Sequence, residues 1–407
     1  MRRPMRRVTG AAAAFVVVVA ASLALAPGTI APAGAVGSPA AGRSVNPEPS
    51  DPPYAEWPVS HSEGVVAGGT TRPPALAEVS EEDAAALQAA IDRAKVANGL
   101  ATLTVGLSVD GELGWSGVAG TTGAPGTTGA AGGPLKGIYP FAVASVTKTF
   151  TAAIILQLVQ EGRILLGSPV TDYLPEVAVA DGATVTQLMQ HVSGVPDMLA
   201  PLRTALNANP DRIWLPSDVL AAVGPSHFVP GTGFEYSNTN YVILGMLIER
   251  VTGHRYVDEL RDRIIEPLGL ANTSFALEPG SPFLFNTSWA SAFWTAASVY
   301  ASAEDVVRWA DALYGGFVLR PQILDRMLDF TPDGWGLGAE RLNVGGLAGY
   351  GHSGLLRGYS TLMLRLPEQR VTLVVMGTTR QFDVPELLAR SAGGPSILEL
   401  ALEIAAR

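Results

Sequence analysis

The stretch FAVASVTKTFTAAIILQLVQEG, residues 141–162, decides the fold and much of the chemistry of this chain. Its second half is apolar on nearly every side, which predicts a helix buried through a core. Just before that run, Ser145 and Lys148 are three residues apart, so both side chains lie on one face of a helix. The chain has 27 basic residues, and only three of them are lysines. A lysine at this position therefore needs a chemical reason.

The chemistry of a buried lysine supplies that reason. Loss of hydration pushes a buried ammonium toward its neutral, basic form. A neutral amine can accept the proton of a serine hydroxyl, whereas arginine stays protonated in proteins. The pair Ser145 and Lys148 therefore predicts a nucleophile and its base. Taken alone, the spacing is equally compatible with Ser145 as a helix cap and Lys148 as a side chain that extends to solvent.

Residues 1–35 have the features of an export signal. Four arginines lie among the first seven residues, residues 11–26 are apolar apart from one serine, and AGA at 33–35 is a small-residue cleavage site. The apolar run is shorter than the roughly 20 residues of a membrane-spanning helix. We therefore expect cleavage and a secreted, extracellular protein on the cell-wall side; an uncleaved signal would tether it to the membrane.

Charge and cysteine content exclude several classes of protein. The net charge is −10, and without the four arginines of the predicted signal it becomes −14. A chain this acidic is not expected to bind nucleic acid or anionic membranes. With no cysteine, it has neither disulfides nor thiolate chemistry, and its core must hold the fold. Its histidines lack the spacing of metal ligands, so we expect no metal and no cofactor.

The rest of the chain divides into a tether and one domain. Residues 36–79 are rich in Pro, Gly, Ser and Ala and are expected to form a flexible tether. Residues 80–407 are predicted to form the domain, which begins with a helix capped by Ser80 and two strands around an Asp110-Gly111 turn. Two more strands turn at residues 367–369, and roughly residues 150–313 are mainly helical. This predicts an α+β fold: an antiparallel sheet from N- and C-terminal segments, flanked by helices, with an inserted all-helical region.

Two further short motifs follow along the chain. Tyr236 and Asn238 lie in FEYSNTNYVILG, in a loop before a predicted helix. A phenol close to the nucleophile can relay a proton to a leaving group, and a carboxamide can hold a substrate amide. His352 and Gly354 lie in YGHSG, at the edge of the final predicted sheet. Glycine lets the backbone approach an acyl group there, so a main-chain N–H can point at an oxyanion.

In this order, the three motifs resemble those of the penicillin-recognising serine hydrolases. Within that group the chain is most similar to class C β-lactamases and secreted actinomycete D-alanyl-D-alanine carboxypeptidases. The surrounding sequence agrees, in TVTQLMQHVSGVPDM (184–198), YSNTNYVILGMLIERVTG, ASAEDVVRWADAL and YGHSG. The resemblance covers about residues 80–407 and implies a β-lactamase and DD-peptidase-like fold.

The resemblance also implies a role for the residues of the first two motifs. Ser145 would be the acylated nucleophile and Lys148 its base partner. Tyr236 would carry a proton between Ser145 and the leaving group. Asn238 would contact the substrate amide.

The third motif would contribute backbone more than side chains. The N–H groups of Ser145 and Leu355, beside Gly354, would form the oxyanion hole. His352 occupies the place where β-lactamases of this class carry lysine, which argues against efficient β-lactamase activity.

A second departure concerns the grip on a substrate carboxylate. Carboxypeptidase members use a threonine directly after His-x-Gly and an arginine after a GLGL-like turn, and Leu355 and Ala339 stand at these positions. A carboxylate facing them has no charge-assisted partner. Arg341 and Arg357 are the two residues that could replace the missing grip. The departures favour an esterase, amidase or endopeptidase on the same scaffold.

The segment between the second and third motifs is short for this family, which suggests an open cleft. Trp289 or Trp294 would form part of its wall, and Trp294 is our candidate for substrate contact. Burial in the core is the alternative for each. His191, in the segment 184–198, is expected to support the site without touching substrate.

These observations favour an exported serine acyl hydrolase that works through acyl-Ser145. The first hypothesis is a penicillin-binding peptidase of the D-alanyl-D-alanine carboxypeptidase type, acting on peptidoglycan stem peptides as a monomer, with β-lactams as inhibitors. The second is a carboxylesterase, or another amidase or β-lactamase-like hydrolase, that takes a small acylated substrate. The third is a non-catalytic binding protein that keeps the fold as a scaffold.

Overall fold

The computed structural model describes residues 72–121, 139–278, 281, 286–378 and 383–407. These residues belong to one of the two units of the chain, Tyr54–Arg407. The predicted signal, residues 1–35, lies outside the described residues, and so does the predicted tether as far as residue 71.

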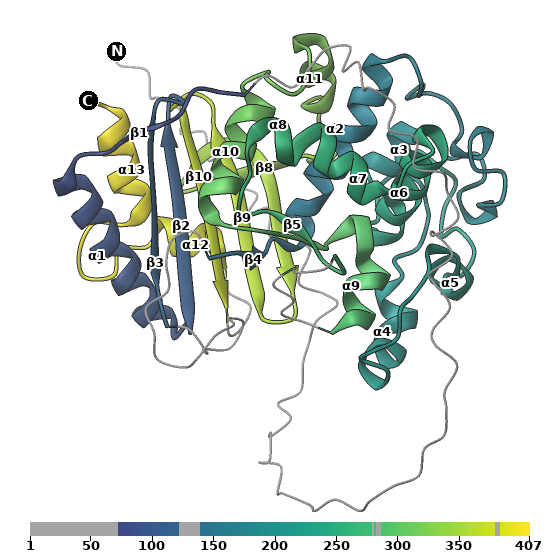
Figure 1. Cartoon of the computed structure of the whole chain (residues 1–407), viewed down its shortest axis with the longest axis horizontal. Coiled ribbons are helices and arrows are strands. Elements are labelled where there is room, and N and C mark those ends of the chain that lie inside the picture. The colour runs from purple at the N-terminus through teal and green to yellow at the C-terminus, as the bar shows by residue number, and fades with distance from the viewer. Residues whose placement is uncertain (1–71, 122–138, 279–280, 282–285, 379–382) are drawn as a thin grey trace, which may run out of the picture. The chain divides into compact units, whose positions relative to one another are not determined.

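A seven-stranded sheet carries the fold, with the strand order β1-β3-β2-β10-β9-β8-β7 (Figure 1). Its strands are β1 (Ala77–Glu78), β2 (Thr102–Val109), β3 (Leu113–Ala119), β7 (Glu340–Val344), β8 (Leu347–Leu356), β9 (Tyr359–Leu366) and β10 (Val371–Thr378). All neighbours are antiparallel except β1 and β3. β2 and β10 pair along their whole length, so the N- and C-terminal segments share one sheet, as the sequence predicted.

The residues of the two turns determine the two predicted hairpins, β2 with β3 and β9 with β10. Asp110 and Gly111 have φ values of 59° and 69°, the left-handed pair that a tight hairpin between β2 and β3 requires. The turn between β9 and β10 spans residues 367–370, one residue more than predicted, and ends at Arg370 with a φ of 59°. One part of the tether prediction is wrong: Ala77–Glu78 is the strand β1, paired with β3.

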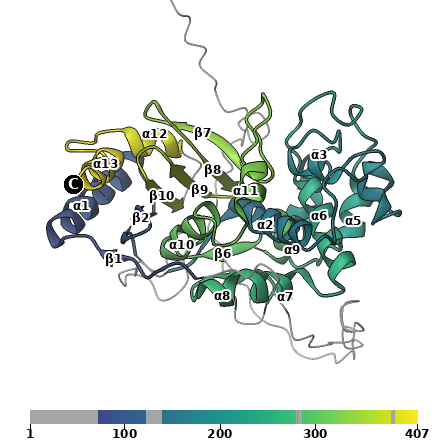
Figure 2. The same cartoon turned by 90° about the horizontal axis from the view of Figure 1, so that it is seen from above.

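Helices flank the sheet on both faces (Figure 2). They are α1 (Glu81–Asn98), α2 (Thr147–Gln160), α3 (Val185–Met189), α4 (Leu199–Ala208), α5 (Pro216–Ala222), α6 (Asn238–Thr252), α7 (Tyr256–Leu260), α8 (Glu266–Leu268), α9 (Thr287–Phe293), α10 (Ala303–Tyr314), α11 (Pro321–Met327), α12 (Val384–Ala389) and α13 (Ile397–Ala405). The N–H of Asp83 donates to the side chain of Ser80, which caps α1 as predicted. α1, α12 and α13 pack on one face of the sheet, and α10 packs on the other.

The region inserted between β3 and β7 is mostly helical, as predicted, but it also contains a small sheet. Its strands are β4 (Phe141–Ala142), β5 (Ser274–Phe275) and β6 (Val299–Ala301), in the order β4-β6-β5. Strands of two or three residues are too short to show a periodic pattern, which is why the sequence did not predict them. Through β4, this sheet fixes the start of the segment that carries the Ser145 motif.

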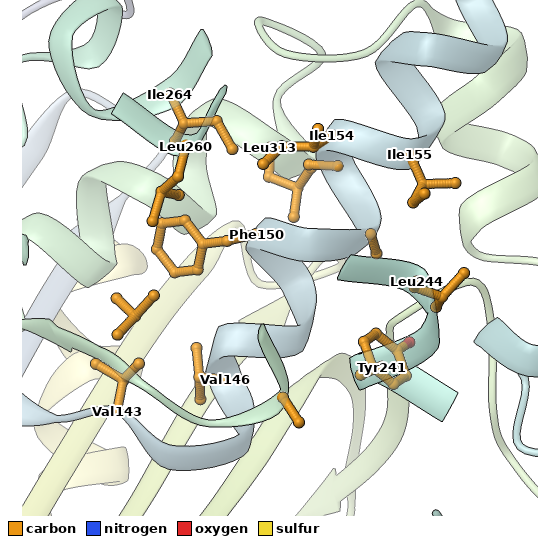
Figure 3. Packing of buried hydrophobic residues seen from close by; sticks show 14 of the residues in the cluster. Val143, Val146, Phe150, Ile154, Ile155, Tyr241, Leu244, Leu260, Ile264 and Leu313 are labelled. Atoms are coloured by element: carbon orange, nitrogen blue, oxygen red, sulfur yellow. The ribbon is translucent and has the colours of Figure 1, made fainter. Parts of the chain in front are cut away.

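The helix α2 runs through the middle of a core, as its apolar sequence predicted. Every residue from Thr147 to Leu158 is buried. Phe150 stacks on Trp309 of α10 with ring centroids 4.3 Å apart, and apolar side chains from α6, α7 and α10 surround α2 (Figure 3). Each fully buried large side chain contributes about 1.5–3 kcal/mol, so the helix is held firmly in place.

Candidate active site

Ser145 lies in a tight turn just before α2. This 3-10 turn, η2 (Ala144–Val146), follows β4 directly, so Ser145 precedes the helix and Lys148 lies in its first turn. Ala144 has a φ of 50°, a left-handed conformation that is unusual for a residue with a side chain. Among residues 141–150, Ser145 is the one that is not fully buried. The fold therefore presents this hydroxyl at a surface.

Lys148 has no exposed surface and three hydrogen-bond partners. Its Nζ lies 2.8 Å from Asn238 Oδ1, 3.0 Å from the carbonyl oxygen of Ala296 and 3.1 Å from Ser145 Oγ. Burial lowers the pKa of Lys148 from 10.5 to about 7, and the charge of Asp197 opposes that fall. Near neutral pH a substantial fraction of this lysine is the neutral amine that a general base requires.

Tyr236 completes the contacts of the serine hydroxyl. Its hydroxyl donates to Ser145 Oγ at 2.9 Å. Burial raises the pKa of this phenol well above its ordinary value, although the hydrogen bond to Ser145 opposes the rise. Tyr236 is therefore a neutral proton donor, and the structure brings together the three residues that the sequence predicted for proton transfer.

His191 supports Tyr236 from behind. Its ring packs on the Tyr236 ring with centroids 4.3 Å apart, and its Nδ1 accepts the N–H of Ser237 at 3.1 Å. Burial lowers the pKa of His191 well below its ordinary value, so the ring stays neutral. The prediction that His191 supports the site without touching substrate agrees with this position.

Asn238 begins α6 and uses both ends of its carboxamide inside the protein. Its Oδ1 accepts from Lys148, and its Nδ2 donates to the carboxylate of Asp197 at 3.2 and 3.3 Å. The backbone N–H of Asn238 also donates to Asp197, at 3.2 Å. The predicted contact with a substrate amide would have to replace or share one of these bonds.

The strand β8 has one open edge beside Ser145. β7 pairs with β8 only as far as Gly351, and the N–H of Ser353 donates to the side chain of Glu340 at 2.9 Å. Because N–H directions alternate along a strand, the N–H of Leu355 points to the same open edge. A side chain at Gly354 would meet the Val143 carbonyl oxygen at 2.6 Å. Glycine there lets β8 approach the serine turn closely, which suits the predicted oxyanion hole.

His352 is buried and neutral. Burial, together with the charge of Lys148, lowers the pKa of His352 to about 3. Its Nδ1 lies 2.5 Å from the carbonyl oxygen of Ser353, so Nδ1 carries the proton and donates. Its Nε2 is buried and has no hydrogen-bond partner among the described residues. His352 therefore does not supply the positive charge of the lysine that it replaces.

None of the residues considered for a carboxylate grip contacts the serine hydroxyl. Ala339 is fully buried in the core. The Arg341 guanidinium packs over Phe330, and Arg357 donates to Asn207 at 3.0 Å. Glu340 is instead an acidic residue next to the open edge of β8, and it accepts both the N–H and the hydroxyl of Ser353. Burial raises the pKa of this carboxyl group, and the two hydrogen bonds from Ser353 oppose the rise.

The two tryptophans of the predicted cleft wall are mainly packing residues. The Trp294 ring lies against Gly245 and 6.0 Å from the Tyr256 ring, so the structure does not bring it to the serine. Trp289 is buried, stacks on Phe293 at 5.4 Å, and donates through its Nε1 to an asparagine of α4 at 3.2 Å.

Sequence reasoning did not single out Asp197 or Glu340. Asp197 stands in the apolar context VSGVPDML, and an acid in such a segment is a usable signal for a buried polar partner. Glu340 alternates with outward-facing residues on β7, and only the register with β8 reveals its neighbour.

A serine with a buried lysine and a tyrosine on its hydroxyl, set in an α+β scaffold, defines a serine hydrolase site. Residues 84–392, most of the chain, match the sequence model of the Beta-lactamase family. The chain belongs to this family, as the order of its motifs predicted.

Relatives of known sequence agree with this assignment. Protein flp of Staphylococcus aureus (strain MW2) is 28% identical over 288 residues, which cover 61% of this chain and 54% of that protein. The chain thus spans about half the length of this relative. Penicillin-binding protein 4 of Amycolatopsis lactamdurans is 29% identical over 276 residues, 58% of this chain and 71% of that protein.

Solved structures give the same fold. A D-stereospecific amidohydrolase from Streptomyces sp. superposes with a TM-score of 0.63 at 28% identity, covering 75% of this chain and 97% of that chain. D-amino acid amidase from Ochrobactrum anthropi SV3, complexed with L-phenylalanine, gives 0.66 at 26% identity, covering 80% and 98%. The β-lactamase and DD-peptidase-like fold class is therefore confirmed.

Among the described residues, no helix has both the length and the apolar character to cross a membrane. Nor do three or more His, Asp or Glu side chains gather as metal ligands in that part of the chain.

Proposed function

We propose that this chain is an exported serine amidase that works through an acyl-Ser145 intermediate and prefers leaving groups without a carboxylate. The match to the Beta-lactamase family supports a serine hydrolase. The residues around the nucleophile favour an amidase over the carboxypeptidase that the sequence suggested first.

The contacts of Ser145 support a two-step reaction. Lys148 takes the hydroxyl proton, and Oγ forms a bond to the substrate carbonyl carbon while the N–H groups of Ser145 and Leu355 hold the oxyanion. Tyr236 then protonates the leaving nitrogen, the C–N bond breaks, and the proton held by Lys148 restores the phenol. Water releases the acid from acyl-Ser145 in the second step, with the same groups exchanging protons in reverse.

The position of Glu340 is the observation that carries the choice of leaving group. Its carboxyl group accepts from Ser353, which lies two residues before Leu355 on the open edge of β8. Along a strand, two residues place the backbone N–H of Ser353 about 7 Å from that of Leu355, the predicted oxyanion donor. Burial accounts for most of the rise in the pKa of Tyr236, and the Glu340 carboxyl adds to it, which is consistent with Glu340 lying near the proton donor to the leaving group. A leaving group with a terminal carboxylate would meet an acceptor there, where it needs a donor.

The comparisons support an amidase in a second way. Two of the structural neighbours, at 28% and 26% identity, are described as a D-stereospecific amidohydrolase and a D-amino acid amidase. The penicillin-binding relative keeps the peptidase as the competing possibility. Export is proposed from the arginine-rich, apolar start of the sequence, and action on a peptidoglycan peptide or another small acylated substrate follows from that location.

The first test asks whether Ser145 is acylated. Intact-mass measurement after incubation with a penicillin is expected to show one adduct on the wild-type protein and none on Ser145→Ala. A wild type that neither forms an adduct nor consumes any amide, ester or penicillin would refute the hydrolase and favour a binding protein.

The second test uses two matched substrates. N-acetyl-D-Ala-D-alaninamide and N-acetyl-D-Ala-D-Ala share the acyl group and differ only in a terminal carboxamide or carboxylate. We expect kcat/KM to be at least about tenfold higher for the carboxamide, and Glu340→Gln to reduce that preference. The opposite preference would show a carboxypeptidase, and cleavage of p-nitrophenyl acetate without either amide would show an esterase.

A further inference from the structure

Asp197 stands behind the catalytic residues and holds the start of α6. Its Oδ1 accepts the backbone N–H of Asn238 at 3.2 Å and that of Leu199 at 3.4 Å, and its carboxylate accepts the carboxamide Nδ2 of Asn238. It contacts neither Ser145 nor Tyr236 by a hydrogen bond. Any influence of Asp197 on the reaction must therefore pass through Asn238 or through its charge.

The two partners of Asn238 leave its carboxamide one orientation. Lys148 can only donate when it is charged, and a carboxylate can only accept. Oδ1 therefore faces Lys148, and the NH₂ group faces Asp197. The flipped amide would place its oxygen against a carboxylate and its NH₂ against an ammonium, so Asp197 locks the orientation.

That orientation decides where the lone pair of Lys148 points. A neutral amine has two N–H donors and one lone pair, and Nζ has three neighbours. Asn238 Oδ1 at 2.8 Å and the Ala296 carbonyl oxygen at 3.0 Å are both acceptors, so they take the two N–H bonds. The lone pair is left for the remaining neighbour, Ser145 Oγ at 3.1 Å. The hydroxyl of Ser145 carries the proton that the base must remove.

We propose that Asp197 is a positioning residue of this hydrolase, which fixes the Asn238 carboxamide so that Lys148 presents its lone pair to Ser145 and which places a carboxylate behind that amide. The inference rests on the proposed acyl-Ser145 mechanism.

Among the described residues, five ionisable groups face Lys148, and Asp197 is the acidic one that carries a negative charge. The others are Tyr236 and Tyr241, whose rings lie 5.0 and 5.4 Å from Nζ, together with His191 and His352. Burial lowers the pKa of both histidines and raises the pKa of both tyrosines, so these four groups are neutral near pH 7. The charge of Asp197 opposes the fall in the pKa of Lys148. Burial raises the pKa of Asp197 itself, and the hydrogen bonds from Asn238 and Leu199 and the charge of Lys148 oppose that rise and favour the carboxylate.

The small number of lysines permits a direct test that needs no substrate. Besides Lys148 the sequence has only Lys95 and Lys136, so Lys95→Arg with Lys136→Arg leaves one lysine for NMR with ¹³Cε-labelled lysine. Lys148 is expected to titrate near pH 7 in this background. With Asp197→Asn added, which keeps an oxygen for the N–H groups of residues 238 and 199, it should titrate about one pH unit lower.

Kinetics then separate positioning from simple support of the fold. The rate of acylation of Ser145 should rise with pH as Lys148 loses its proton, and in Asp197→Asn this rise should move to lower pH with a lower plateau. Asn238→Asp alone sets two carboxylates against each other and should lose about a hundredfold or more in kcat.

The exchanged pair Asp197→Asn with Asn238→Asp is the decisive variant. The new amide can donate to the new carboxylate, which still accepts from Lys148, so kcat should recover at least about tenfold over Asn238→Asp. The negative charge moves nearer to Lys148, so the rise in rate should move to higher pH than in the wild type.

Two results would overturn the role of Asp197. One is an unmoved lysine titration in Asp197→Asn, and the other is a change in KM alone, which would assign Asp197 to substrate binding. A wild type that forms no acyl-Ser145 refutes the proposed function instead, and the NMR titration still tests the link between Asp197 and Lys148 in that case.

Discussion

Two buried clusters of this molecule pair an acid with a cation, and they use different cations. At the catalytic site, Lys148 has no exposed surface and lies in the field of Asp197. Beneath the sheet, Asp311 of α10 accepts the hydroxyl of Thr372 at 2.6 Å and faces Arg365 of β9 at 3.6 Å. About a fifth of the Arg365 side chain is exposed.

The difference between the clusters follows from what each must do with a proton. Arginine stays protonated in proteins, and Arg365 reaches water near the end of β9, so it serves as a permanent partner for Asp311. Lys148 is cut off from water, and burial brings its pKa to about 7. Of the 27 basic residues of the chain, 24 are arginine, and lysine is present at this position, where the side chain has to lose its proton.

Exchanging the cations should give the largest effect. Lys148→Arg puts a permanently charged group beside Ser145, and we expect the acylation rate to fall by about a thousandfold. Arg365→Lys, the matched change in the other cluster, should stay within about twofold of the wild type. The rate of penicillin adduct formation by mass spectrometry measures both. Equal losses in the two variants would remove the distinction between the clusters.

Removing the catalytic cation should stabilise the protein over a defined pH range. The pKa of Lys148 lies near 7 in the folded protein and at an ordinary 10.5 when unfolded, so between these pH values the unfolded chain binds more protons. Stability of the wild type therefore rises with pH across that window, and the full penalty of the buried charge applies below pH 7. Lys148→Met should be more stable by a few kcal/mol at pH 6.

Urea unfolding at several pH values checks this prediction. The advantage of Lys148→Met should shrink as the pH rises from 7 toward 10. An advantage that is constant with pH would mean that packing, and not the charge of Lys148, sets the difference.

Removing the acid of the second cluster should affect stability alone. Asp311→Ala leaves the Thr372 hydroxyl without its acceptor and removes the carboxylate that faces the Arg365 guanidinium, and we expect a loss of about 1–3 kcal/mol in the free energy of unfolding. Activity per folded molecule should be unchanged, in contrast to Asp197→Asn. A matching fall in kcat would show that the sheet and the catalytic site are coupled.

The smallest effect is expected at the arginine of that cluster. Arg365→Lys keeps the charge near Asp311, and because the side chain reaches solvent the change should cost below about 1 kcal/mol. Thermal unfolding at pH 7 measures it. A larger loss would show that the planar guanidinium, which also donates to Thr372 at 3.0 Å, is needed for its geometry.

The sequence by itself determined the chemistry-bearing residues and the plan of the fold. Lysine three residues after serine before an apolar helix and the turn residues of two hairpins are local signals, and each depends on residues close together in the chain. The order of the three motifs spans residues 145–354, and it was informative because it resembles the order in a known family. They predicted Ser145, Lys148 and Tyr236 as one site, and the structure joins them by hydrogen bonds at 3.1 and 2.9 Å.

Only the tertiary structure decided how these residues are supported and what surrounds them. Asp197 meets Asn238, and Glu340 meets Ser353, through contacts between segments far apart in the sequence. Trp294 is half-buried and packs against the core, where Gly245 of α6 leaves room for its ring, and no local pattern encodes that space. Hydrogen bonds and burial between distant segments set the orientation of Asn238 and the pKa of Lys148, so the sequence names the catalytic residues while the packing of the fold sets their reactivity.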